Sequence, residues 1–184
     1  MTTVVELFDD SAGTWDEISF SDWKIEHGVS EVRLAPEATV WTGRGADPSP
    51  GQRIRIVDDG TTLFEGQIAR APAESTGNRG NIKIDAEHDA FALFEEQVSL
   101  SESSPTDSQV LSAALSAAST SAFTLNFVAT TTSLGNDYNV EDRKIKRIFR
   151  DITDRTGRVW WVDIDNTIHV DTLGGRGLFA SVDT

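Results

Sequence analysis

Residues 51–98 constrain the fold of this chain more than any other stretch, because their apolar residues recur at every second position. Ile54 and Ile56 alternate with polar neighbours, which is the pattern of a half-buried strand. The Asp58-Asp59-Gly60 sequence predicts a turn, a second strand follows at 63–69, and a third at 82–86. The stretch therefore predicts an antiparallel sheet.

Two residues of the second strand carry the prediction of how this sheet curves. Phe64 lies on its core side, while Gly66 leaves no side chain on that face. A glycine inside a strand usually marks a bulge or another element that crosses closely. The apolar cluster at 87–98 has helical or turn spacing, so we predict a small β-barrel or curved sheet closed by these residues.

The N-terminal residues extend the same region. Segments 3–8 and 14–20 read as strands joined by a turn, and shorter apolar pieces continue to Trp41 before a Gly- and Pro-rich loop at 43–51. We therefore expect residues 1–99 to form an antiparallel β-barrel domain.

The periodicity changes after the serine-rich segment 99–106. Thr106 and Gln109 have the spacing of a capping box and open a predicted helix that reaches about residue 121. A strand at 123–127, a second helix from Val140 to Gly157, and a hairpin then follow, the hairpin strands being 159–164 and 167–170. The expected fold class is α+β: the β-barrel, a small α/β domain (helix, strand, helix, β-hairpin) at 100–172, and a tail at 173–184.

Composition excludes several classes of protein. The chain has no cysteine, which excludes disulfides and thiolate chemistry, and no apolar run or N-terminal pattern predicts a membrane span or an export signal. A net charge of −14 disfavours binding to nucleic acid. Acidic residues spread along the whole chain, with few lysines, resemble proteins of salt-loving archaea and their viruses; an ordinary acidic protein is the alternative.

Motifs for catalysis or cofactor binding are missing from the sequence, so we expect no enzyme and no cofactor. The only compact set of potential ligands is Asp85, Glu87, His88 and Asp89, which a solvated strand end explains equally well. His27 and His169 are isolated. Asp163 and Asp165 resemble the start of a calcium loop, but its glycine and distal glutamate are missing, so we interpret them as turn residues.

Two further groups are candidates for a subunit interface. Seven of the sixteen basic residues lie within residues 143–158: Arg143, Lys144, Lys146, Arg147, Arg150, Arg155 and Arg158. Four of them, Arg143, Lys146, Arg147 and Arg150, are expected on an outward helix face that either docks on an acidic neighbour or is solvated, with Asp142, Asp151 and Asp154 available to neutralise it. Adjacent Trp160 and Trp161 must face opposite sides of a strand, which predicts one core residue and one interface anchor.

Three stretches together resemble a known family: GQRIRIVDDGTTLFEGQI, NIKIDAEHDAFALF, and DRKIKRIFRDITDRTGRVWWVDIDNTIHV. They resemble the N-terminal half of the central baseplate hub proteins of long-tailed viruses. The family pattern is a strand and turn followed by L-F-x-G-x-I, then a helix ending in T-G that leads into an aromatic strand and a D-x-D-x-x-I hairpin. The match covers about two thirds of the chain. Such hubs usually carry a further β-domain after the α/β unit, so the resemblance implies either that this C-terminal half lies elsewhere or that the chain is a shortened or neighbouring tail component.

The resemblance implies a structural protein of the viral tail tip, located in the virion and made in the host cytoplasm. It implies a homotrimeric ring that continues or closes the tail tube and holds distal tail or fibre proteins. A hexameric distal tail adaptor and a tail-associated glycan-degrading enzyme remain as alternatives, the latter requiring a cleft with two nearby carboxylates.

Overall fold

The computed structural model describes residues 2–26, 35–43, 48–70, 82–119 and 122–172. Contacts divide the chain between Asp89 and Ala90 into two compact units, here called the N-terminal and C-terminal units. The boundary predicted after residue 99 lies within a strand of the C-terminal unit instead. His27 and the predicted tail at 173–184 fall outside the described residues. No described helix is long and apolar enough to span a membrane.

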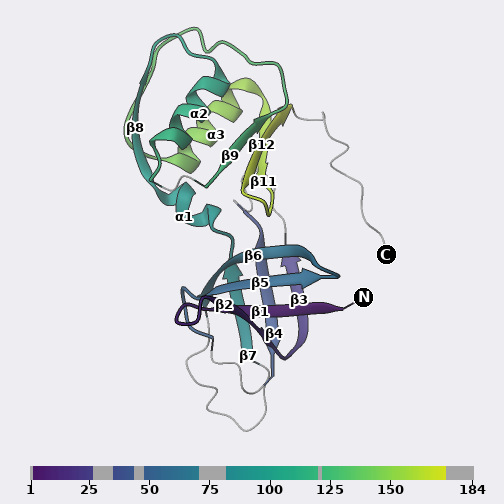
Figure 1. Cartoon of the computed structure of the whole chain (residues 1–184). Helices are drawn as coiled ribbons and strands as arrows, with labels where there is room; N and C mark the ends of the chain where they lie inside the picture. Colours follow the sequence, from purple (N-terminus) through teal and green to yellow (C-terminus); the bar gives the residue numbers. More distant parts are fainter. Residues whose placement is uncertain (1, 27–34, 44–47, 71–81, 120–121, 173–184) are drawn as a thin grey trace. The chain divides into compact units, whose positions relative to one another are not determined.

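The N-terminal unit is a seven-stranded antiparallel sheet with strand order β2-β1-β5-β6-β7-β4-β3 (Figure 1). Its strands are β1 (Thr3–Asp9), β2 (Thr14–Ile18), β3 (Phe20–Glu26), β4 (Glu37–Thr42), β5 (Arg53–Asp58), β6 (Thr61–Arg70) and β7 (Ile82–Glu87). The predicted hairpin is confirmed as β5 and β6. Its turn takes Asp59 and Gly60 into positive φ, at 45° and 81°, as the Asp-Gly pair predicts.

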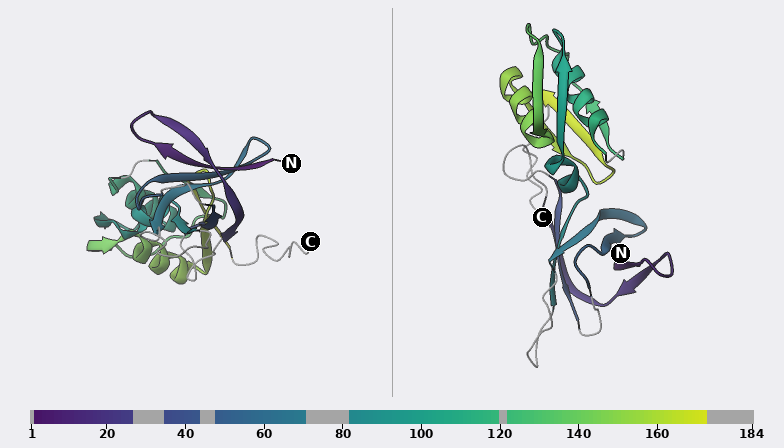
Figure 2. Two further views of the ribbon diagram at one scale, coloured as in Figure 1. Left: turned by 90° about the horizontal axis from the view of Figure 1, so that it is seen from below. Right: turned by 90° about the vertical axis from the view of Figure 1, so that its left-hand side faces the viewer.

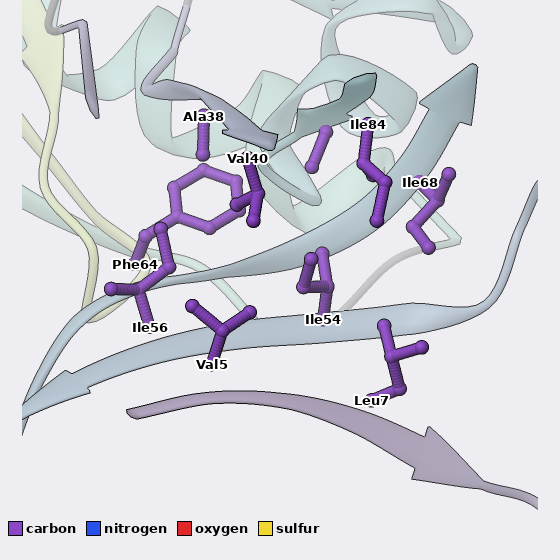
Figure 3. Packing of buried hydrophobic residues seen from close by; sticks show 10 residues of the cluster. Val5, Leu7, Ala38, Val40, Ile54, Ile56, Phe64, Ile68 and Ile84 are labelled. Carbon is purple, nitrogen blue, oxygen red and sulfur yellow. The ribbon is translucent and has the colours of Figure 1, made fainter. Parts of the chain in front are cut away.

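One face of this sheet forms the core of the unit. Val5, Ile54 and Phe64 are fully buried, and with their neighbours from β1, β4, β5, β6 and β7 they point into one apolar interior (Figure 3). The described part of this unit contains no helix, so the sheet must curl until its own strands cover that face. Strands of the same sheet therefore enclose the core from both sides.

The predicted closure into a β-barrel is wrong, because the edge strands β2 and β3 do not pair. They are consecutive in the chain and separated by Ser19 alone. A single residue cannot turn the chain back through a hairpin, so the two strands cannot lie alongside each other. The general prediction of an α+β fold is confirmed, with an open curled sheet in place of the barrel.

Gly66 makes the close approach that the sequence predicts. A Cβ atom at this position would lie 2.3 Å from the carbonyl oxygen of Glu87 on β7. Glycine is therefore required where β6 meets β7.

The C-terminal unit places α2 (Asp107–Ala117) and α3 (Ile145–Thr156) side by side between two small sheets (Figures 1 and 2). One sheet pairs β8 (Gln97–Glu102) with β10 (Tyr138–Lys144), and the other has the order β11-β12-β9, formed by β11 (Arg158–Val162), β12 (Thr167–Thr172) and β9 (Thr124–Phe127). The short helix α1 (Ala90–Glu95) precedes them. The capping box at Thr106 and Gln109 is confirmed, as is the hairpin of β11 and β12.

The second helix begins later than predicted. Residues from Val140 to Lys144 belong to β10, which pairs with β8, and α3 begins only at Ile145. Strand β8 itself lies where the sequence predicts a domain boundary, although Val98 and Leu100 are buried at alternate positions. The strand is hard to recognise in the sequence, because its serines interrupt the apolar pattern and only Val98 and Leu100 alternate with polar residues. Gly157 ends α3 in the left-handed conformation, at the predicted residue.

Candidate interaction surfaces

The predicted basic stripe is divided between a strand and a helix. Arg143 lies near the end of β10, whereas Arg147 and Arg150 lie on the outward side of α3, and all three are exposed. Lys146 is half-buried. The seven basic residues therefore do not share one surface, and their contacts differ from one residue to the next.

The two lysines are paired inside the C-terminal unit. Lys144 and Lys146 both donate to the carboxylate of Glu95, the last residue of α1. Hydrogen bonds from Lys144 and then Lys146 lower the pKa of Glu95, which keeps it ionised. Because Lys146 already has this partner, its charge serves to join α1 to α3.

The C-terminal half of the outward face of α3 is partly neutralised. Arg155 pairs with Asp151 one turn earlier, at 3.1 Å between Nη2 and Oδ2, as the i, i+4 spacing predicts. Asp151 also accepts a hydrogen bond of 3.1 Å from the hydroxyl of Tyr138. Burial, then the charge of Asp151, raises the pKa of Tyr138 to about 12.

Arg158, the last of the seven clustered basic residues, points inward. Its side chain is 3% exposed and its Nε donates to Oδ2 of Asp107, a fully buried side chain, at 2.6 Å. It also donates to the carbonyl oxygen of Thr130 and, at 3.0 Å, to Oγ1 of Thr132. Asp107 in turn accepts from the backbone N–H of Thr132 at 2.9 Å. This network joins β11, the start of α2 and the segment between β9 and β10.

Three arginines remain exposed between the end of β10 and the middle of α3, and they are here called the basic face: Arg143, Arg147 and Arg150. Among the described residues, no ion pair satisfies Arg143 or Arg147. Of the predicted interface residues, these three have guanidinium groups that solvent and another chain can reach.

Both tryptophans of the predicted interface are buried within the C-terminal unit. Trp160 is 3% exposed and packs against Phe94 and Phe149, with ring centroids 4.8 and 5.4 Å apart. Trp161, 6% exposed, faces the other side of the sheet and stacks on His169 with a 5.0 Å centroid distance. Neither offers an exposed face in this structure, so the proposed subunit interface rests on the basic face.

Several of the acidic and histidine candidates have partners within their own unit. Asp85 pairs with Lys83 at 2.7 Å, and His88 is buried. His169 is not isolated, since its Nε2 lies 2.9 Å from Asp163. Asp165 accepts from the backbone N–H of Thr167 in the hairpin turn. Within the described part of the chain, no three His, Asp or Glu side chains converge as metal ligands.

The N-terminal unit has a groove that the sequence does not reveal. It has a volume of about 770 Å³ and lies between the β1–β2 hairpin and residues 49–52. Gln52 holds that segment in place by donating to the carbonyl oxygen of Phe8 at 3.0 Å. Its lining includes apolar side chains, Leu7, Ile18 and Pro50, and the carboxylates of Asp9, Asp10 and Asp16. The groove is here called the acidic groove.

The sequence alone treats Asp9 and Asp10 as turn residues. Asp9 does serve the turn, because it accepts from Ser11 and Ala12, and these bonds, the side-chain bond of Ser11 first, lower its pKa. Asp16 lies opposite Leu7 in the register, so an exposed carboxylate stands on the core side of an edge strand. In the sequence, the only signal for this arrangement is that Asp16 lies two positions before apolar Ile18 and so on the same face of the strand.

A curled antiparallel sheet followed by a layered α/β unit is the fold of about half of several phage tail proteins. A tail protein from Neisseria meningitidis matches with a TM-score of 0.65 at 15% identity, covering 92% of this chain and 50% of that one. The 43 kDa tail protein of prophage MuSo2 from Shewanella oneidensis matches with a TM-score of 0.66 at 8% identity, covering 94% and 56%.

A third structure extends the likeness beyond prophages. A component of the type VI secretion system of E. coli, described as structurally similar to the T4 tail proteins gp27 and gp5, has a TM-score of 0.61 at 12% identity and coverages of 90% and 48%. At these identities the likeness establishes the fold, and the chain spans about half the length of each structure. By sequence, the chain matches no protein-family model and no curated protein.

Proposed function

We propose that this chain is a structural protein of a viral tail, acting at the tail tip as part of the baseplate hub. The observation that carries the proposal is that both units, in the same order, match tail proteins over 90% or more of the chain. A match confined to the curled sheet would be weaker support, since a fold alone hosts many functions.

In the proposed role, several copies form a ring that continues or closes the tail tube and anchors distal tail or fibre proteins. A homotrimer is the arrangement implied by the hub resemblance, and a hexamer is the arrangement of the alternative adaptor. The work of such a ring is mechanical, so the proposal assigns no catalytic residue and no cofactor. The host suggested by the acidic composition, a salt-loving archaeon, is a separate proposal that rests on composition.

Mass measurement of the purified protein in solution tests the ring. We expect a mass three times that of the 20.1 kDa chain, either alone or after addition of the tail-tube protein of the same virus. Six copies would favour the adaptor. A chain that stays monomeric at low and high salt, both alone and with the tube protein, would contradict the proposal.

A further inference from the structure

The basic face conflicts with the electrostatics of its own helix. The first turn of α3 contains no acidic residue, and its N-cap residue Lys144 makes no capping hydrogen bond through its side chain. The N-terminus of a helix carries a partial positive charge, which favours carboxylates there and disfavours cations. Arg147 stands in that turn and Arg143 just before it. Helix stability therefore does not explain why these positions are basic.

The division between lysine and arginine points to contact with another chain. The lysines of this region are paired within the unit by Glu95, whereas the exposed positions are arginines. Arginine is favoured at protein interfaces, because its planar guanidinium binds carboxylates through two parallel hydrogen bonds and its stem packs on apolar surface.

The acidic groove has the complementary chemistry. The apolar part of its lining suits the aliphatic part of an arginine, while the carboxylates of Asp10 and Asp16, both exposed, also line it. Its surroundings have the same sign, since residues 1–89 carry 17 acidic and eight basic residues. The complementarity is local to the two surfaces, because every copy carries the same net charge of −14.

From this complementarity we propose that the basic face of one copy docks in the acidic groove of a second copy of the same chain. The inference rests on the ring proposed above and identifies the two surfaces that build it. Because the surfaces differ and lie on different units, the contact is head-to-tail. Contacts of this kind generate closed rings of three or more copies when the rotation closes, which a self-complementary dimer contact does not do.

Charge reversal on each side tests the contact. One variant carries Arg143→Glu and Arg147→Glu, a second carries Asp10→Lys and Asp16→Lys, and a third carries all four substitutions. Since like charges facing each other at a contact are strongly unfavourable, each one-sided variant should assemble at least about tenfold more weakly than the wild type at low salt. The four-fold variant, whose charges are complementary again, should regain the ring.

Mixing the two one-sided variants also reports the copy number. Each variant repels itself and attracts the other, so copies must alternate around a mixed ring. Alternation closes only with an even number of copies. A hexamer therefore re-forms on mixing, whereas a trimer re-forms only from the chain that carries all four substitutions.

The control carries Lys24→Glu and Lys83→Glu, which change the net charge by the same amount at exposed lysines of the N-terminal unit. It should assemble like the wild type, and circular dichroism should show that every variant is folded. Full assembly by a one-sided variant, or a folded four-fold variant that stays apart, would overturn the contact while leaving the ring intact. A monomeric wild type, with and without tube protein, would overturn ring and contact together.

Discussion

At the scale of single residues, Gly66 shows how one backbone contact constrains the curled sheet. Its Cα lies so close to β7 that a Cβ would meet the carbonyl of Glu87 at 2.3 Å, a contact that only a backbone shift relieves. We expect Gly66→Ala to lower the free energy of unfolding by about 1–3 kcal/mol, measured by urea denaturation. Gly43 has open space at the same atom and no positive φ, so Gly43→Ala is the matched control. Equal stability of the two variants would contradict this placement.

Tyr138 gives the chain a pH dependence that can be observed directly. It is the only tyrosine, so the absorbance change of phenol ionisation reports this residue alone. The pKa in the folded chain is about 12, above the usual value of 10.0 for a tyrosine, because burial and Asp151 disfavour the phenolate. The folded chain therefore holds its proton more tightly than the unfolded chain. The stability that results is fully present below pH 10 and is lost as pH rises through about 12.

We expect the absorbance near 295 nm, the region of phenolate absorption, to titrate with a midpoint near 12 in the folded protein and near 10 in urea. Tyr138→Phe should abolish the signal and make stability between those two pH values less dependent on pH. Ionisation with the same midpoint in both states would show that Tyr138 is solvated.

At the scale of the elements, the buried ion pair between Arg158 and Asp107 holds parts of the C-terminal unit together. It connects β11 to the start of α2, and removing one partner leaves a charge buried without compensation. We expect Arg158→Met to cost about 3–5 kcal/mol in the free energy of unfolding, measured by denaturant titration.

Arg155→Met is the control for this prediction. It breaks the exposed ion pair with Asp151 in the same region, and exposed pairs contribute only about 0–1 kcal/mol. If the two variants lost the same stability, Arg158 would have to be solvated.

The elements also show which local signals suffice for prediction. The β5–β6 hairpin and the capped start of α2 follow from turn and capping residues that act within a few positions, and both are confirmed. Strand β10 fails as a sequence prediction, because Arg143 and Lys144 continue the polar pattern of the following helix. Only the pairing of β10 with β8 makes that segment extended.

At the scale of the whole molecule, the net charge of −14 predicts a response to salt. Raising KCl from about 0.1 M to about 2 M shortens the screening length several-fold and weakens the repulsion among carboxylates. We expect the melting temperature to rise by several degrees over this range, measured by calorimetry.

The salt response needs a control for effects that do not depend on charge. A neutral osmolyte such as sucrose, which favours the compact state by exclusion from the surface, gives that comparison. A melting temperature that rises no more in KCl than in sucrose would favour an ordinary acidic protein over one adapted to high salt.

The sequence by itself determined the α+β class, the hairpin at the centre of the sheet and the close approach at Gly66, since these depend on alternation and on turn residues within a few positions. Only the tertiary structure decided that the sheet stays open, because that depends on β2 and β3 lying at opposite edges. It likewise decided that Arg158 is buried while Arg147 is exposed. The two arginines belong to the same basic cluster in the sequence, and the difference is that Asp107, 51 positions from Arg158, is brought beside Arg158.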